Sequence, residues 1–225
     1  MIEVVRSIEK ALSEIYNLDL PVRAEDFLLV QPTAGTVVSS GKNFESMHGA
    51  IYLQYNEAAE VADEPQLDVG IFFSDSLRET LNSTPIDKPH AWSEAQSHAV
   101  AIAGEEISHF HYLLYHALSG RSVSQLELEI QGDIDKFLLL YFSRQQWEEQ
   151  CFEEVFERVF EKFSLSARLT TEQVNRYLEA NQFARKCIHK HRKVLLSSEN
   201  METALKSLRR FYRLGASEKI SLLAG

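Results

Sequence analysis

The chain reads A-G-E-E-I-S-H-F-H-Y-L-L-Y-H over residues 103–116, inside a strongly helical pattern. At about 100° per residue, Glu105, His109, His116 and the preceding His98 fall in one narrow stripe of this helix. Helical side chains four positions apart lie side by side. We therefore expect Glu105 and His109 to reach one common ion or proton.

The next helical segment reads L-E-L-E-I-Q-G-D over residues 126–133 and places Glu129 and Asp133 four positions apart. Both acids share a face with apolar residues, so this face is expected to contact other parts of the protein. Charged groups are rarely buried unless they are paired or bind a metal. The short connection predicts that the two helices are antiparallel neighbours. Glu129 and Asp133 are then expected to face Glu105 and His109.

Together these segments resemble the signature of the gluzincins, the zinc metallopeptidases that include thermolysin. That signature is H-E-x-x-H on one helix, followed on the next helix by a Glu ligand and an Asp four residues later. Here E-E-I-S-H over residues 105–109 is followed, after 19 intervening residues, by E-I-Q-G-D over residues 129–133. The order of a helix, a small sheet and the motif helices over roughly residues 2–142 is also similar to the minimal zincin fold. The resemblance implies a zincin-like α+β fold.

The resemblance also implies a role for each matching residue. Glu106 falls at the position of the general base, and His109 falls at the second zinc-ligating His. Glu129 falls at the third ligand, and Asp133 falls at the carboxylate that orients a ligand His. The first ligand departs from the pattern, because Glu105 stands where the family has His.

A Glu at this position changes the chemistry expected of the site. One His with two carboxylates is harder and more anionic than two His with one Glu, which favours manganese, iron or magnesium. A bound water would be less acidic and a weaker nucleophile. The sequence leaves two alternatives: one divalent metal (zinc, or manganese or iron given the carboxylates), or no metal, with the acids sharing protons or pairing with Lys and Arg. His98 and His116 are either further polar members of the site or hydrogen-bonded core residues.

Length and composition restrict the class of protein. With 225 residues, 44% hydrophobic and 25% charged, the chain is typical of one sizeable soluble domain. No apolar run reaches the roughly 18 residues of a membrane span. Residues 1–15 carry acids among their apolar residues, which is not typical of a signal peptide. The two cysteines, Cys151 and Cys187, provide no disulfide framework, so we expect a reducing cytoplasm.

Hydrophobic periodicity predicts a single α+β domain over residues 1–225, with a helix and small sheet in 1–90, the motif helices in 91–165 and basic helices in 166–225. A sheet of three or four strands is expected from β-like runs near residues 27–30, 36–39, 50–55 and 67–73. Helices are expected over 2–17, 76–81, 93–118, 124–163 with a bend near 143–146, 170–194 and 201–214. An aromatic stripe over residues 152–163 is expected in the core.

Charge is distributed unevenly along the chain. Residues 1–183 hold 13 Lys and Arg against 30 Asp and Glu, a net of −17, whereas residues 184–225 hold 10 against 3, a net of +7. The basic end either binds a polyanion or docks on the acidic body of the same chain or of a second copy. The candidates for polyanion or partner binding are Arg185, Lys186, Lys190, Arg192, Lys193, Arg209, Arg210 and Arg213.

Three functions remain open from the sequence. The one we expect is a zincin-like protein with a degenerate metal motif, acting as a non-catalytic binding or regulatory module for a protein partner or in self-association. The second is a metal-dependent hydrolase with an atypical Glu105/His109/Glu129 site and Glu106 as base. The third is an adaptor that binds nucleic acid or an acidic partner through its basic C-terminal helices. No membrane partner is expected.

Overall fold

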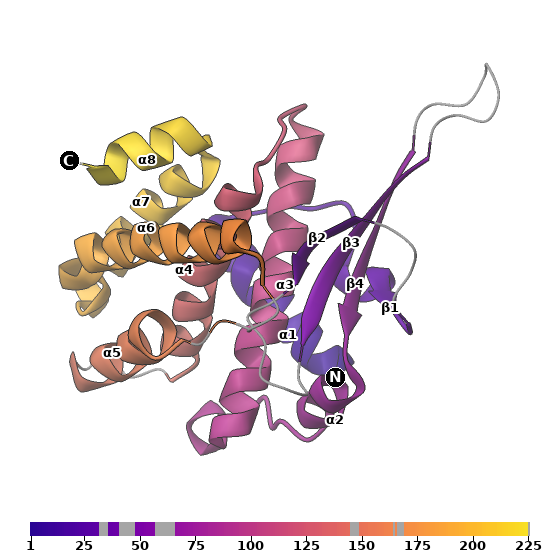
Figure 1. Cartoon of the computed structure of the whole chain (residues 1–225). Helices are drawn as coiled ribbons and strands as arrows, with labels where there is room; N and C mark the ends of the chain where they lie inside the picture. Colours follow the sequence, from indigo (N-terminus) through magenta and orange to yellow (C-terminus); the bar gives the residue numbers. More distant parts are fainter. Residues whose placement is uncertain are drawn as a thin grey trace.

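The computed structural model describes residues 1–31, 36–40, 48–56, 66–144, 149–163, 165 and 169–224. The chain has the expected α+β class: a four-stranded sheet lies on one side and helices form the rest (Figure 1). The elements before the motif helices are α1 (Ile2–Tyr16), the 3₁₀ turn η1 (Ala24–Phe27), β1 (Leu28–Leu29), β2 (Thr36–Ser40), β3 (Gly49–Asn56), β4 (Gln66–Phe73), α2 (Asp75–Asn82) and the 3₁₀ turn η2 (Pro89–Ala91). The later elements are α3 (Glu94–Leu118), α4 (Gln125–Ser143), α5 (Glu149–Phe156), the π turn η3 (Glu157–Glu161), α6 (Thr171–Leu195), the 3₁₀ turn η4 (Ser198–Asn200), α7 (Met201–Arg213) and α8 (Ala216–Ala224).

The strands are in the order β1-β4-β3-β2. Strands β3 and β4 are antiparallel over their whole length, β2 is antiparallel to β3, and β1 is parallel to β4. Side chains on one face alternate into the core, so Ile51, Ile71 and Phe73 are completely buried. The strand expected over residues 27–30 is shorter than predicted, because Ala24–Phe27 form a 3₁₀ turn and leave only two residues for β1.

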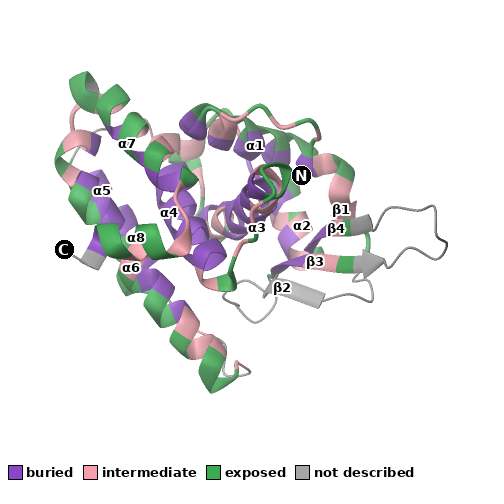
Figure 2. Ribbon diagram, turned by 90° about the horizontal axis from the view of Figure 1, so that it is seen from above, coloured by how far each residue is buried: buried purple, intermediate pink, exposed green. Residues whose placement is uncertain are grey.

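Helices α3 and α4 form the centre of the molecule, and buried residues follow both of them in Figure 2. Each begins with a capping box, at Ser93 and at Ser124, as the sequence predicts. Side-chain contacts join Glu105 to Lys136 and Tyr112 to Glu127, which is the pairing of antiparallel neighbours. The antiparallel arrangement of the two motif helices is therefore confirmed.

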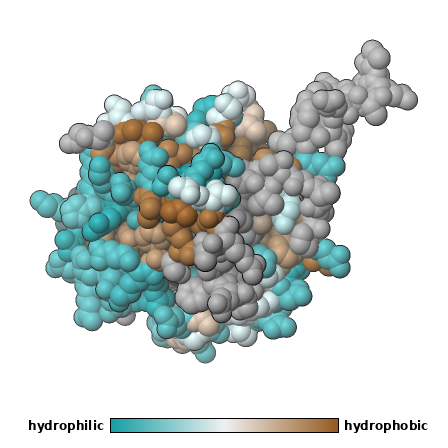
Figure 3. Space-filling model, viewed as in Figure 1, coloured by the Kyte–Doolittle hydropathy of each residue, from teal (hydrophilic) through white to brown (hydrophobic). Residues whose placement is uncertain are grey.

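The prediction of a single helix over residues 124–163 is wrong. Helix α4 ends at Ser143, α5 begins at Glu149, and a π turn follows α5; residues 145 and 146 of the expected bend lie outside the described part of the chain. The core prediction for the aromatic stripe is confirmed for Phe152, Phe156 and Phe160, which are buried and in ring contact with Phe137. The surface over α5 is hydrophilic in Figure 3, while hydrophobic residues gather nearer the middle of that face. Helix α8 was not predicted, because its pattern is short and contains a central Lys.

The basic C-terminal helices dock on the body of the same chain. Arg209 donates to the carbonyls of Glu14 and Ile15, and Arg213 donates to that of Tyr16, so α7 caps the C-terminal end of α1. Positive charge at a helix C-terminus is favourable because the last carbonyls have no partner inside the helix. The arginines of α6 form ion pairs with carboxylates instead: Arg185 pairs with Glu161, and Arg192 pairs with Glu149 and Glu153.

None of the described helices combines the length and the apolar character that crossing a membrane requires.

We expect Arg209→Ala to lower the free energy of unfolding by about 1–2 kcal/mol, because two carbonyls at the end of α1 lose a charged donor. The matched control is Arg210→Ala on the exposed face of the same helix, which is expected to change stability by less than about 0.5 kcal/mol. Urea denaturation of both variants measures the difference. Equal stabilities would contradict the capping role.

Candidate functional site

The packing of α3 on α4 brings Glu105, His109 and Glu129 together. One ligand atom from each lies within 4.8 Å of those of the other two, and all three residues are buried. The close approach depends on Gly132, since a Cβ at that position would lie 2.7 Å from His109 Nε2. This group could hold a metal ion, as the sequence predicts for these residues.

Lys136 is the residue that the sequence reasoning missed. Its ammonium lies 3.0 Å from Glu105 Oε2 and 2.7 Å from Asp133 Oδ1. Burial lowers the pKa of Lys136, but Asp133 and Glu105 outweigh burial and raise it well above its usual range. Lys136 therefore stays charged and joins the two acids. Its position three residues after Asp133 on a buried helical face is the feature that could have identified it.

Glu106 is fully buried and packs against the sheet. A Cβ at Gly49, the first residue of β3, would lie 2.5 Å from Glu106 Cγ, so the strand runs directly over this side chain. Neither carboxylate oxygen of Glu106 has a hydrogen-bond partner among the described residues; His109 Nδ1 lies 3.6 Å from Oε2. Burial raises the pKa of Glu106, and the neighbouring His109 offsets only part of that effect.

Both ring nitrogens of His109 face oxygen atoms. Nε2 lies 3.1 Å from the carbonyl oxygen of Leu128, and Nδ1 faces Glu106. Burial lowers the pKa of His109, but Glu106, Glu129 and Glu105 together raise it to about 9. At neutral pH the ring therefore carries two protons and donates to the Leu128 carbonyl. A metal ion would have to displace one of these protons, because only a neutral imidazole coordinates a metal.

The donor set of Glu105, His109 and Glu129 nevertheless fits a divalent ion chemically. An imidazole and two carboxylates suit manganese or iron as well as zinc. Such an ion would supply positive charge and Lewis acidity at the centre of the α3–α4 pair. It would compete with the Lys136 ammonium for Glu105.

The structure places the two other histidines of the stripe in different surroundings. His98 is partly buried and lines a cavity together with Glu105 and Lys136. His116 lies about two turns beyond His109 on α3. There Nδ1 accepts a hydrogen bond from Arg121 Nε at 3.0 Å, and Nε2 lies 3.3 Å from the Tyr212 carbonyl. The structure therefore does not bring His116 to the metal-capable group.

A second buried polar network joins α3 and α4 to α1 and α8. Asp135 accepts hydrogen bonds from Tyr16, from Ser108 and from Gln131, and Gln131 accepts one from Lys219 of α8 at 3.1 Å. The sequence did not reveal this network, because its members come from four helices far apart in the chain. It fixes the relative position of α1, α3, α4 and α8 behind the Glu105 group.

The candidates for polyanion binding fall into two sets. Arg185, Arg192, Arg209 and Arg213 bond to carboxylates or carbonyls of this chain, as described above. The others, Lys186, Lys190, Lys193 and Arg210, are exposed on α6 and α7, and of these Lys190 also donates to the Leu222 carbonyl at 3.4 Å.

No known family model, curated protein or solved structure matches this chain. Its function is therefore inferred from its residues and their geometry alone.

We expect the protonated His109 to stabilise the fold in a pH-dependent way. Its pKa rises from about 6.5 unfolded to about 9 folded, so this contribution is complete below pH 6.5 and is lost as the pH rises through 9. The stability advantage of the wild type over His109→Gln should fall over this range by at most about 1.4 kcal/mol per pH unit.

Urea denaturation of both proteins at pH 6, 7.5 and 9 tests this expectation. Lys219 has the opposite effect, because burial lowers its pKa to about 7, but it is present in both proteins and cancels in the difference. A difference in stability that does not change with pH would show that His109 is neutral in the folded state.

Proposed function

We propose that this chain is a zincin-like protein whose degenerate metal motif forms the framework of a non-catalytic binding or regulatory module. The observation that carries the proposal is the Lys136 ammonium, which contacts Glu105 at 3.0 Å and Asp133 at 2.7 Å. A side-chain cation thus supplies, inside the fold, positive charge to the position where the gluzincin signature has its first ligand. Glu105 and Asp133 then act as structural acids.

The surroundings of Glu106 support the same proposal. A general base must come within hydrogen-bond distance of the proton that it removes from substrate or water. Glu106 is completely buried, and β3 crosses its side chain at Gly49. In this position it contributes to the packing of α3 against the sheet and has no path to a substrate through β3.

The alternative is a metal-dependent hydrolase, and one observation favours it. Glu105, His109 and Glu129 bring their ligand atoms within 4.8 Å of one another, and all three are buried. The third function, an adaptor that binds nucleic acid, has less support, because four of the candidate arginines bond within the chain.

The decisive experiment is the metal content per chain, measured by mass spectrometry on protein purified without a metal-binding tag or chelator. We expect well under one equivalent of metal, a folded protein, and no rise in melting temperature with added zinc, manganese or iron. One equivalent of metal, lost in both His109→Ala and Glu129→Ala, would overturn the proposal and support the hydrolase. Ser207→Ala, an exposed position on α7, is a control that should leave the metal content unchanged.

We expect Lys136→Met to lower the free energy of unfolding by about 3–5 kcal/mol, because it leaves two buried carboxylates without their cation. The matched control is Lys10→Met, which removes an exposed pair with Glu14 and should cost less than about 1 kcal/mol. Chemical denaturation measures both. A Lys136→Met variant as stable as the control would show that the ion pair is not the framework that we propose.

A further inference from the structure

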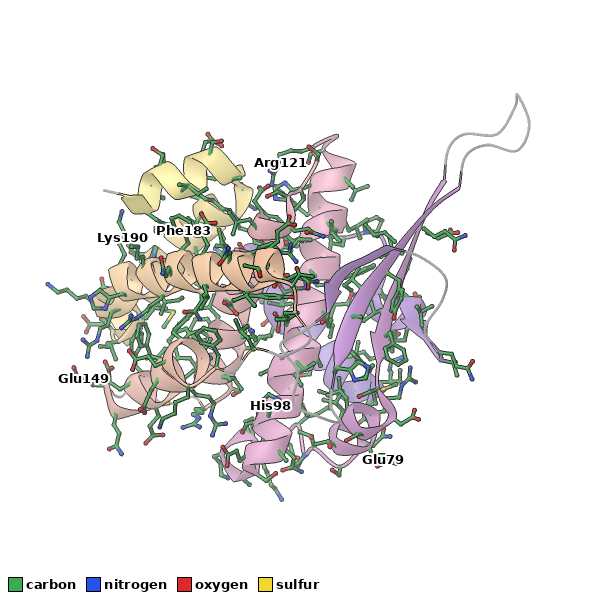
Figure 4. The ribbon with its side chains drawn as sticks, viewed as in Figure 1. Glu79, His98, Arg121, Glu149, Phe183 and Lys190 are labelled. Atoms are coloured by element: carbon green, nitrogen blue, oxygen red, sulfur yellow. The ribbon has the colours of Figure 1, made fainter. Side chains whose placement is uncertain are left out.

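A cavity of about 820 Å³ opens beside the Glu105 group, between the first half of α3, the end of α4, α5 and the π turn. Glu105 and Lys136 lie where it meets the buried site, and His98, labelled on α3 in Figure 4, lines it from the side. Its volume is in the range of pockets that bind small molecules. The alternative hydrolase function would not use it, since neither Glu106 nor His109 lines it.

The charged residues of the wall are largely paired with one another. Lys136 pairs with Glu105, Arg144 pairs with Glu154 at 2.9 Å, and Lys162 pairs with Glu157 at 3.0 Å. Arg158, by contrast, makes no hydrogen bond or ion pair with the described residues, although it lines the same cavity. Arg158 is thus the guanidinium available to a ligand.

Two cations, Lys136 and Arg158, line the cavity together with His98. Burial lowers the pKa of His98, and Lys136 and Arg158 lower it further, whereas Glu105 and Glu94 only partly oppose them. Two cations therefore act on the same part of the wall. Because Lys136 is already paired with Glu105 and Asp133, an anionic group placed there would gain chiefly from Arg158. A guanidinium binds a carboxylate through two parallel hydrogen bonds.

Most of the remaining wall is apolar: Ala101 and Ile102 of α3, Leu140 of α4, and Val159 and Phe163 after α5 line it. The start of α3 adds the polar side chains of Glu94 and Ser97. Val159 and Arg158 belong to the π turn, a distortion that is frequently found at functional sites. The turn places a cationic and an apolar side chain next to each other on one cavity wall.

We propose that this cavity binds a small monocarboxylate with an apolar tail, of the medium-chain fatty acid type, with its carboxylate on Arg158 and its tail along the apolar wall. This inference rests on the proposed function, because it gives the binding module its ligand. A carboxylate balances the charge of Arg158, and an aliphatic tail matches a wall built from Ala, Ile, Leu, Val and Phe.

The test is isothermal titration calorimetry of the full chain with decanoate, below its micelle concentration. We expect saturable binding at one site per chain, and we expect decanol, which lacks the carboxylate, to bind at least tenfold more weakly. Arg158→Gln should weaken decanoate binding at least tenfold. The matched control is Arg185→Gln, whose arginine pairs with Glu161 outside this cavity and which should bind decanoate normally.

A second variant tests whether the aliphatic tail of decanoate lies along the apolar wall of the cavity. Ala101→Phe fills the cavity from α3 and should abolish decanoate binding while the circular dichroism spectrum stays that of the wild type. If this variant does not fold, Leu140→Ser replaces it and should weaken decanoate more than acetate. Absence of decanoate binding to the folded wild type, equal binding of decanol, or unchanged binding in Arg158→Gln would each overturn the inference. A metal-free protein that fails to bind decanoate would leave the proposed function intact.

Discussion

The fold depends on one buried ion pair network, in which the ammonium of Lys136 joins Glu105 of α3 to Asp133 of α4. Two acids at the contact between central helices would repel each other and would be costly to bury without a cation. With Lys136 between them, α3 and α4 approach closely enough for Gly132 to touch the His109 ring. This close approach also sets the positions of Glu129, of the sheet over Glu106 and of the cavity beside Glu105.

The buried polar groups of the α3–α4 pair form two networks. One contains Glu105, Glu129 and His109; the other is centred on Asp135, which accepts hydrogen bonds from Tyr16 and Gln131. Buried polar groups of this kind specify one arrangement of the helices, because any other arrangement would leave them without partners. The apolar stripe on each helix alone would permit several alternatives.

Local sequence was sufficient to predict much of this arrangement. Capping boxes at Ser93 and Ser124 and the four-residue spacing of Glu105 with His109 depend on neighbours along the chain, and the structure has all of them. Contacts between distant segments could not be predicted in the same way. The spacing of Lys136 from Asp133 is local, but its contact with Glu105 joins residues 31 positions apart. The destination of His116 likewise depends on Tyr212, which lies 96 residues away.

The capping of α1 by α7 has a consequence for how the protein is made. The carbonyls of Glu14, Ile15 and Tyr16 are bonded by Arg209 and Arg213, nearly two hundred residues later. During synthesis from the N-terminus, the first helix therefore receives these donors only after residues 209–213 have left the ribosome. Such distant contacts slow folding, so the end of α1 is completed late in the folding of this domain.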